Sequence, residues 1–272
     1  MVSEVIKLKY NQIINQDCIE GMKNIQPDII DLIITDPPFA IDFKAKKANY
    51  NRIASRVLEG YKEIPQKEYY EFTLNWMSEC YRILNESGSM YVFSGWNNLR
   101  DILNAIEKIG FTVVNHIIWK YQFGVVTNRK YVTSHYHCLL ICKNDKKRKF
   151  FPYERFGKDE KNDQGRSLHY RDKEDVWEIK REYWTGSEKT PTKLPAEIIK
   201  KILEYSSEKG DLVFDPFMGS GQTAVVSKME KRKYLGFEIV KEYYKFISKR
   251  LDSNSYHIKP SDDNDDPEVT WA

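Results

Sequence analysis

Residues 29–35 read IIDLIIT, a nearly continuous apolar run broken by one acid. A strand that lies on the surface alternates apolar and polar residues, whereas a strand covered on both faces in a parallel sheet is apolar almost throughout. The next residues, DPPF, have the composition of a turn. The run therefore predicts an interior strand of a parallel sheet that ends at Thr35.

Helix-like and strand-like segments alternate after this run. Apolar residues recur at helical spacing over 68–85, and Gly88 follows as a stop signal. The segment 89–94 then has strand character, a second helical stripe ends at Gly110, and 111–119 is again strand-like. This alternation predicts βαβ units, and hence a doubly wound α/β domain with a mostly parallel sheet and helices on both faces.

The middle of the chain follows a different pattern. Segment 135–143 resembles one more strand, but 144–186 is charged, punctuated by glycine and without a clear period, so we expect an insertion or small lobe outside the sheet. Regular structure resumes with helices expected at 195–206, up to 231 and at 240–251, and strands at 211–214 and 233–239. These patterns predict a catalytic part at 1–125, an inserted region at 126–186, a second part of the same domain at 187–252 and an acidic tail at 253–272.

Composition narrows the class of protein. Apolar residues make up 41% of the 272 residues and charged residues 31%, which indicates a globular chain rather than a disordered or membrane protein. No apolar run approaches the roughly 18 residues of a membrane span, and the first residues do not resemble a secretory signal, so we expect a cytoplasmic protein. The four cysteines match no disulfide framework and are expected to be reduced.

The formal net charge is only +3, but its distribution is uneven. Five acidic residues lie between Asp262 and Glu268, so the rest of the chain is more basic than the total indicates. Basic residues gather after the DPPF turn and again over 143–149. Both clusters are suited to a phosphate backbone, although lysine-rich segments are more often ordinary solvated loops.

The turn Asp36-Pro37-Pro38-Phe39 lies where ligands bind in open parallel sheets, at the carboxyl end of a buried strand. Two prolines stiffen the backbone and remove two N–H groups, so the turn offers mainly acceptors. The Asp36 carboxylate and the Pro37 carbonyl can accept both protons of an exocyclic amino group while Phe39 stacks on the ring that carries it. A nucleobase fits this description, and so does the alternative of a capped turn with Phe39 in the core.

The second turn, DPFMGSG at 215–221, joins the expected strand 211–214 to a helix. Gly219 and Gly221 allow positive φ and close approach of a ligand at the helix amino end. No lysine takes a P-loop position, which argues against a nucleoside triphosphate. Glu238 ends the next strand, near the offset at which an acid binds ribose hydroxyls in dinucleotide folds, so spacing alone leaves a nicotinamide cofactor open.

With both turns considered together, the chain resembles the S-adenosylmethionine-dependent DNA amino-methyltransferases, which methylate adenine N6 or cytosine N4. DPPF resembles their catalytic motif and DPFMGSG their cofactor loop. The order, with the catalytic motif first, resembles the permuted β group, in which a target-recognition region lies between the two motifs. The likeness runs from about residue 13 to 251, and it implies a Rossmann-like methyltransferase fold with S-adenosylmethionine as cofactor.

The resemblance implies roles for individual residues. Catalysis would fall to Asp36, Pro37, Pro38 and Phe39. Cofactor binding would fall to Asp17, Thr192, Asp215, Phe217, Gly219, Gly221 and Glu238. The element TPTKLP at 190–195 departs from the family's H-P-T-x-K-P, because Thr190 replaces the usual His and Leu194 the usual Lys. Contacts to DNA are expected from Lys44, Lys46, Lys47, Arg52, Arg56, Trp119, Arg129 and Lys130.

No metal is expected. On a strand His135 and His137 share one face while Cys138 and Cys142 share the other, so the four side chains cannot converge without a bulge. The aromatic residues of 151–184 are expected to form a small local core rather than platforms for stacking bases.

The expected activity is site-specific methylation of double-stranded DNA, with adenine N6 favoured and cytosine N4 as the alternative. Readings from other classes are an RNA or protein methyltransferase, a non-catalytic nucleic-acid-binding module and a nicotinamide dehydrogenase. The first has the motifs in the opposite order, and the last leaves DPPF unexplained. The resemblance also raises a homodimer and a cognate restriction endonuclease as partners.

Overall fold

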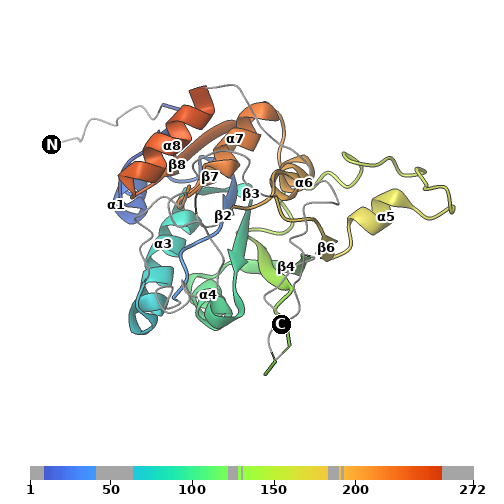
Figure 1. Ribbon diagram of the computed structural model, residues 1–272. Helices are drawn as coiled ribbons and strands as arrows, with labels where there is room; N and C mark the ends of the chain where they lie inside the picture. The colour runs from blue at the N-terminus through green and yellow to red at the C-terminus, as the bar shows by residue number, and fades with distance from the viewer. Residues whose placement is uncertain are drawn as a thin grey trace.

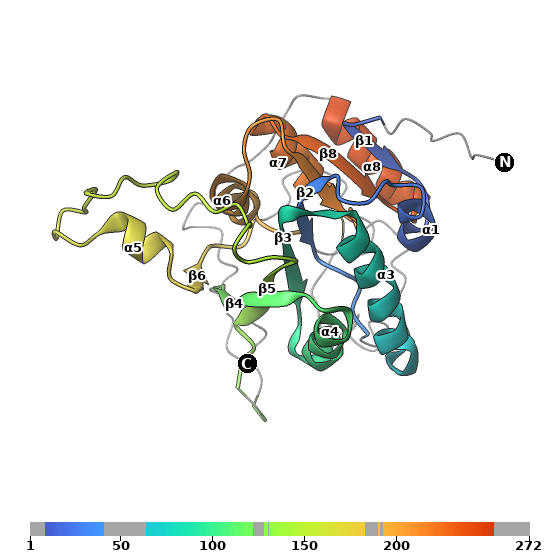
Figure 2. The same ribbon diagram turned by 180° about the vertical axis from the view of Figure 1, so that it is seen from behind.

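The structure is a computed structural model that describes residues 9–40, 64–121, 128–129, 131–182, 190 and 193–252. Eight strands of this part form one sheet with the order β1-β8-β7-β2-β3-β5-β4-β6 (Figures 1 and 2). The strands are β1 Gln12–Ile14, β2 Ile30–Thr35, β3 Leu84–Ser94, β4 Thr112–Lys120, β5 His135–Cys142, β6 Val176–Glu178, β7 Leu212–Asp215 and β8 Lys233–Phe237. The helices are α1 Cys18–Met22, η3 Gln66–Glu68, α3 Tyr69–Ile83, α4 Trp96–Ile109, α5 Leu168–Asp172, α6 Ala196–Ser206, α7 Gln222–Met229 and α8 Lys241–Asp252.

The predicted doubly wound α/β fold is confirmed. All neighbouring strands run parallel except β5, which lies antiparallel between β3 and β4. Strand β2, the apolar run of the sequence, lies in the interior between β7 and β3, and its side chains from Leu32 to Thr35 are fully buried. A strand covered on both faces needs apolar residues on both, which is why the alternation of a surface strand is absent.

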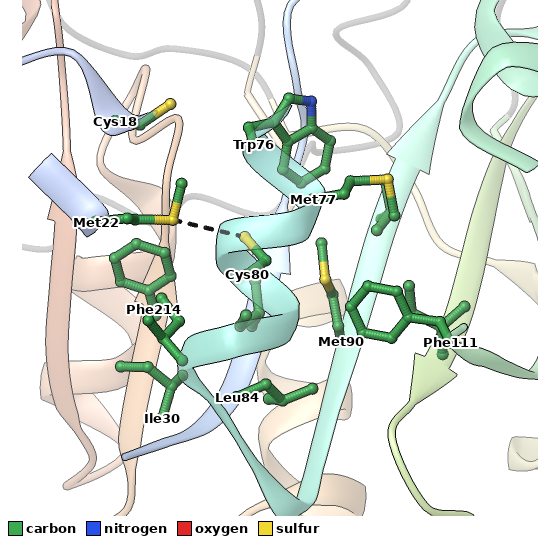
Figure 3. Packing of buried hydrophobic residues seen from close by; sticks show 14 of the residues in the cluster. Cys18, Met22, Ile30, Trp76, Met77, Cys80, Leu84, Met90, Phe111 and Phe214 are labelled. Carbon is green, nitrogen blue, oxygen red and sulfur yellow. Dashed lines mark hydrogen bonds between the residues drawn. The ribbon is translucent and has the colours of Figure 1, made fainter. Parts of the chain in front are cut away.

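Two apolar clusters cover the two faces of the sheet. One face packs against α1, α3 and α4, with Trp76, Met77 and Cys80 of α3 fully buried (Figure 3). The other face packs against α6 and α7, and α8 continues this layer beside α7. The helical stripe of α4 ends at Gly110, which adopts φ +96° and terminates the helix without a Cβ clash. No helix in the part that the structure describes is both long and apolar enough to cross a bilayer.

The range 126–186 is not separate from the sheet. Strand β5 pairs with both β3 and β4, and the short strand β6 pairs in parallel with β4 through Ile118 and Val176. The expectation that 144–186 lies wholly outside the sheet is therefore wrong at its carboxyl end. Helix α5 does extend away from the sheet beyond β6, as both views show (Figures 1 and 2). The predicted local aromatic core is wrong for Trp177, which is buried in the main core, and for Tyr170, which is 69% exposed.

Candidate active site

The first turn leaves the carboxyl end of β2 and turns inward. Phe39 is only 8% exposed, and its ring centroid lies 5.8 Å from that of Tyr136 on β5. Tyr136 in turn lies about equally far from the rings of Trp119 and Tyr121, at 6.0 Å each. The turn therefore forms one end of a row of aromatic rings. Tyr136, in the middle of this row, was not predicted as a site residue because no motif in the sequence marks it individually.

The second turn leaves β7, the strand beside β2. Gly221 adopts φ +72° at the amino end of α7, and a Cβ there would lie 2.4 Å from Ile247 of α8. Gly219 adopts φ +50°, and a Cβ there would meet nothing closer than 3.7 Å. Gly221 is thus required by both backbone conformation and packing, whereas Gly219 leaves the loop open on the side of a ligand. Phe217 packs edge-on against Trp76 with ring centroids 5.3 Å apart.

The two turns share one cavity of about 200 Å³. The neighbouring parallel strands β2 and β7 end at the same edge of the sheet, so their turns project into the same space. The cavity lining includes the following residues predicted from the sequence: Asp17, Asp36, Pro37, Pro38, Phe39, Asp215, Phe217, Gly219 and Glu238. Gly221 does not line it, and Thr192 lies outside the described residues.

Glu238 and Asp17 reach the cavity from β8 and α1. Glu238 accepts hydrogen bonds from the backbone N–H groups of Gly219 and Val240, both at 2.7 Å, so its carboxylate fixes the glycine loop. Asp17 caps α1 by accepting from the N–H of Ile19 at 2.9 Å. Both acids therefore have a local structural contact as well as a place in the cavity wall.

Buried carboxylates dominate the electrostatics of the cavity. Burial and the nearby Asp215 charge raise the pKa of Asp36 to about 7. Burial raises the pKa of Asp215 to about 6, with hydrogen bonds from Phe217, Thr223 and Thr35 opposing the rise. Burial also raises the pKa of Glu238 to about 7. Grouped carboxylates with raised pKa values in a cavity are typical of a functional site and favour a cationic ligand.

Lys193 supplies a basic group that sequence reasoning missed. It lines the cavity together with Leu194, which is also part of the apolar core. The Lys193 ammonium lies 2.5 Å from Glu182, which also accepts from the Gln222 side chain at 3.1 Å. Burial lowers the pKa of Lys193, and Glu182 opposes this change. Thr190, which stands where the family's histidine is usual, is buried and also lines the cavity.

The residues expected to contact DNA are mostly beyond what the structure describes. Lys44, Lys46, Lys47, Arg52, Arg56 and Lys130 lie outside the described residues. Arg129 is exposed. Trp119 is only 4% exposed and donates its indole N–H to the Ile179 carbonyl at 2.8 Å, so in this structure it supports Tyr136 rather than presenting a face to DNA.

The basic segment 143–149 is an ion-paired surface of the fold. Lys143 pairs with Asp28 at 2.6 Å, Lys147 with Glu86 at 3.4 Å and Lys149 with Asp211 at 2.8 Å. The acidic partners come from distant parts of the sequence. In the folded protein they neutralise part of the positive charge that the sequence of this segment shows. The interpretation as an ordinary solvated segment is therefore favoured over phosphate binding here.

The histidine and cysteine residues of β5 lie as its alternation predicts. Cys138 and Cys142 are buried, and His137 hydrogen-bonds His116 on β4 with 2.8 Å between the ring nitrogens. Burial, with the neighbouring imidazoles, lowers the pKa of His137 to about 4. Within the described ranges, no three acidic, histidine or cysteine side chains are grouped as metal ligands.

The cavity fits a cofactor that combines a positive charge with an adenosine. The acids Asp17, Asp36, Asp215 and Glu238 line one space, and Phe217 adds a flat apolar face. The open side of Gly219 leaves room for close backbone approach at the start of α7. S-adenosylmethionine carries a sulfonium charge and a purine, so the donor set and charge of this site suit it.

Comparisons with known proteins agree with this site. The sequence profile of the N6/N4 DNA methylase family matches residues 30–250. The type II methyltransferase M.HpaI of Haemophilus parainfluenzae is 30% identical over 248 residues, covering 89% of this chain and 74% of that protein. The DNA adenine methyltransferase YhdJ of Escherichia coli K12 is 29% identical over 259 residues, covering 90% of this chain and 84% of that protein.

A solved structure shows the same relationship in three dimensions. The crystal structure of the M1.HpyAVI–SAM complex superposes with a TM-score of 0.61 at 26% identity, covering 89% of this chain and 98% of that one. The profile match contains both turns and the strands that carry them. This chain belongs to the N6/N4 DNA methylase family and is an S-adenosylmethionine-dependent DNA amino-methyltransferase.

Proposed function

We propose that the protein methylates N6 of adenine in double-stranded DNA and that Asp36 and its turn grip the target amino group. The observation that carries the proposal is the single cavity shared by the Asp36 turn and the Gly219 loop. A methyl group can pass directly between two ligands only if both lie in one space with their reacting atoms close together.

The first turn has the acceptors that an amino group needs. Two prolines remove N–H donors from the turn, and the Oδ1 atom of Asp36 is buried with no hydrogen-bond partner in the described residues. An exocyclic nitrogen is a poor nucleophile because its lone pair is delocalised into the ring. If the amino group donates one hydrogen bond to Asp36 and one to the Pro37 carbonyl, its nitrogen becomes pyramidal. The lone pair is then free to attack the methyl group of the donor.

The second turn supports the cofactor. S-adenosylmethionine supplies an activated methyl group when bound. We assign the ribose hydroxyls to Glu238, which also accepts from the N–H of Gly219, and the purine to Phe217. We assign the methionine part to Asp215, and a further cofactor contact to Asp17, which reaches the same cavity from α1. Thr192 keeps its predicted role beside the cofactor.

The target base must leave the duplex to reach this cavity. Unstacking costs a few kcal/mol, and stacking against Phe39 with Tyr136 beside it offsets part of that cost. We assign backbone contacts to the basic residues after the turn and to Arg129 and Lys130. The region 126–186 is proposed to recognise the target sequence. A homodimer and a cognate restriction endonuclease are proposed partners.

Adenine is preferred over cytosine on two grounds. YhdJ, a relative of similar length, is named a DNA adenine methyltransferase. Asp before Pro-Pro also favours adenine within the family that the sequence resembles. Neither ground depends on base-edge contacts.

The test is analysis of the modified base. Double-stranded DNA from an unmodified host is incubated with the protein and methyl-labelled S-adenosylmethionine, and the digested nucleosides are separated. We expect label in N6-methyldeoxyadenosine, and none with the Asp36→Ala variant. Label in N4-methyldeoxycytidine would contradict the choice of base, and label transferred to RNA or protein but not to DNA in parallel incubations would contradict the choice of DNA.

A further inference from the structure

Thr35 is a fully buried hydroxyl at the junction of the two turns. It is the last residue of β2 and directly precedes Asp36. Its Oγ1 donates to Oδ1 of Asp215 on β7 across 3.0 Å. The two residues are 180 positions apart in sequence, so this hydrogen bond joins the segments that carry the two halves of the site.

This bond lies beyond the backbone pairing of the two strands. Strands β2 and β7 pair at Leu32 with Val213 and at Ile33 with Phe214. Past these pairs β2 stays paired with β3 as far as Thr35, and β7 stays paired with β8 as far as Asp215. The Thr35 hydroxyl therefore continues the connection by one side-chain hydrogen bond at the point where the catalytic turn begins.

Loss of the hydrogen bond between Thr35 and Asp215 would affect the two aspartates differently. Asp215 accepts from three donors, because Phe217 N–H also reaches Oδ1 at 3.0 Å and the Thr223 hydroxyl reaches Oδ2 at 2.9 Å. Without Thr35, each Asp215 oxygen keeps one donor. Oδ1 of Asp36 has no such support in the part of the chain that the structure describes.

We propose that Thr35 is a positioning residue that holds the Asp36 turn against the cofactor loop, so that its hydroxyl sets the rate of methyl transfer rather than the affinity for S-adenosylmethionine. The inference rests on the proposed function of the Asp36 turn. Thr35 does not line the cavity, so its hydroxyl acts through Asp36 and not on the ligands themselves. It fixes the end of β2, and thereby the direction in which Asp36 enters the cavity.

The test compares rate and affinity in matched variants. Thr35→Val is nearly isosteric and removes only the hydrogen bond, and Thr35→Ser restores the hydroxyl. Thr73→Val is the control, because Thr73 is equally buried on α3 and its hydroxyl has no hydrogen-bond partner in the described residues. Thr223→Val removes a donor to Asp215 from the cofactor side. Single-turnover methyl transfer at saturating cofactor gives the rate, and calorimetry gives the dissociation constant.

We expect Thr35→Val to slow transfer at least tenfold with a dissociation constant within about threefold of wild type. Thr35→Ser should recover most of the rate, Thr73→Val should change neither quantity, and Thr223→Val should weaken cofactor binding. If Thr35→Val does not fold, the ratio of rates between Thr35→Ser and Thr35→Ala measures the same hydroxyl.

Three results would overturn the inference: a wild-type rate in Thr35→Val, an equal loss of affinity and rate, or a failure of serine to exceed alanine. These outcomes differ from failure of the proposed function. If the proposed function fails, the wild-type protein itself transfers no methyl group to DNA, and the proposed role of Thr35 is then wrong as well.

Discussion

Two Asp-Pro dipeptides end the neighbouring strands β2 and β7, yet their carboxylates have different surroundings. Asp215 accepts hydrogen bonds at both oxygens from three donors within its own turn, its helix and β2. Asp36 has a buried oxygen without a partner in the described part of the chain. A satisfied carboxylate stabilises a loop, whereas an unsatisfied buried acceptor costs free energy and is available to a ligand. The same dipeptide thus builds a support at one strand end and a reactive position at the next.

The largest expected effect is the loss of transfer in Asp36→Ala. The variant removes the side-chain acceptor, so only the Pro37 carbonyl remains to accept from the amino group. Transfer should fall by about 10²- to 10³-fold or more, a size found when one preorganised hydrogen bond to a reacting group is removed. Cofactor affinity by calorimetry should stay within a few-fold. A parallel loss of affinity would place Asp36 in the supporting class with Asp215.

For Glu238→Ala we expect a smaller effect, and one on cofactor affinity instead of the transfer step. The variant removes the acceptor of the Gly219 and Val240 N–H groups, so the cofactor loop loses its anchor. Because hydrogen bonds to charged groups contribute roughly 1.5–3 kcal/mol each, affinity for S-adenosylmethionine should fall about 10- to 100-fold. Glu107→Ala, on the exposed face of α4, is the matched control. Unchanged affinity in Glu238→Ala would remove this acid from the cofactor site.

The pH dependence of transfer should report the reactive carboxylate. Ionised Asp36 is the stronger acceptor for the amino group, because the protonated acid is uncharged and one of its oxygens carries a donor. Burial and the Asp215 charge raise the pKa of Asp36 to about 7. The value of kcat/KM should therefore rise about tenfold per pH unit below 7 and level off above it. Asp215→Asn removes the neighbouring charge and should move this limb to lower pH. A limb near pH 4 in the wild-type protein would mean that Asp36 is solvated.

The same raised pKa makes a stability prediction for Asp36→Asn. The folded state holds its proton up to about pH 7, whereas the unfolded chain loses it near pH 4, so the free energy of unfolding falls as pH rises through this window. At pH 8 without cofactor, the variant should be more stable than wild type by roughly 3–4 kcal/mol, at about 1.4 kcal/mol for each pH unit of this window. At pH 4 the difference should nearly vanish. Denaturant titrations at the two pH values measure it, and equal stability at pH 8 would show that ionised Asp36 costs nothing.

The smallest effect tests how rigid the supporting turn is. Gly221→Ala places a Cβ 2.4 Å from Ile247 at φ +72°, whereas Gly165→Ala adds one at φ +73° with nothing within 4 Å. Both variants carry the backbone strain of about 1 kcal/mol, but only the first must also move α8. Gly221→Ala should therefore be the less stable of the two by roughly 1–2 kcal/mol in thermal or denaturant unfolding. Equal losses would indicate that Ile247 yields freely.

Much of the fold could be predicted from the sequence because its signals are local. The apolar run of β2, the stripes of α3 and α4 and the glycine at the end of α4 each depend on a few consecutive residues. Strand β6 was missed because three residues in a charged segment carry almost no pattern, and its pairing with β4 is decided by tertiary contact. The ion pairs of 143–149 could not be predicted for the same reason, since the partners Asp28 and Asp211 lie far away in sequence.

The candidate site could be predicted only where a motif marks it. The two Asp-Pro turns and Glu238 stand at strand ends with distinctive neighbours, and the structure places them around one cavity. Other residues of the site belong to no motif, because a threonine at a strand end or a lysine before a helix is common. These residues are Thr35, Tyr136, Lys193 and Glu182. Their importance arises from pairings across the sheet and between helices, which no local pattern encodes.

We propose that the Asp36 turn and the Gly219 loop act on one pair of ligands in one cavity. A crystal structure of the protein with S-adenosylmethionine is the direct test. We expect the cofactor between Glu238 and Phe217 with its sulfonium methyl group directed toward the Asp36 carboxylate. A cofactor bound outside this cavity, or one whose methyl group is separated from Asp36 by protein, would contradict it.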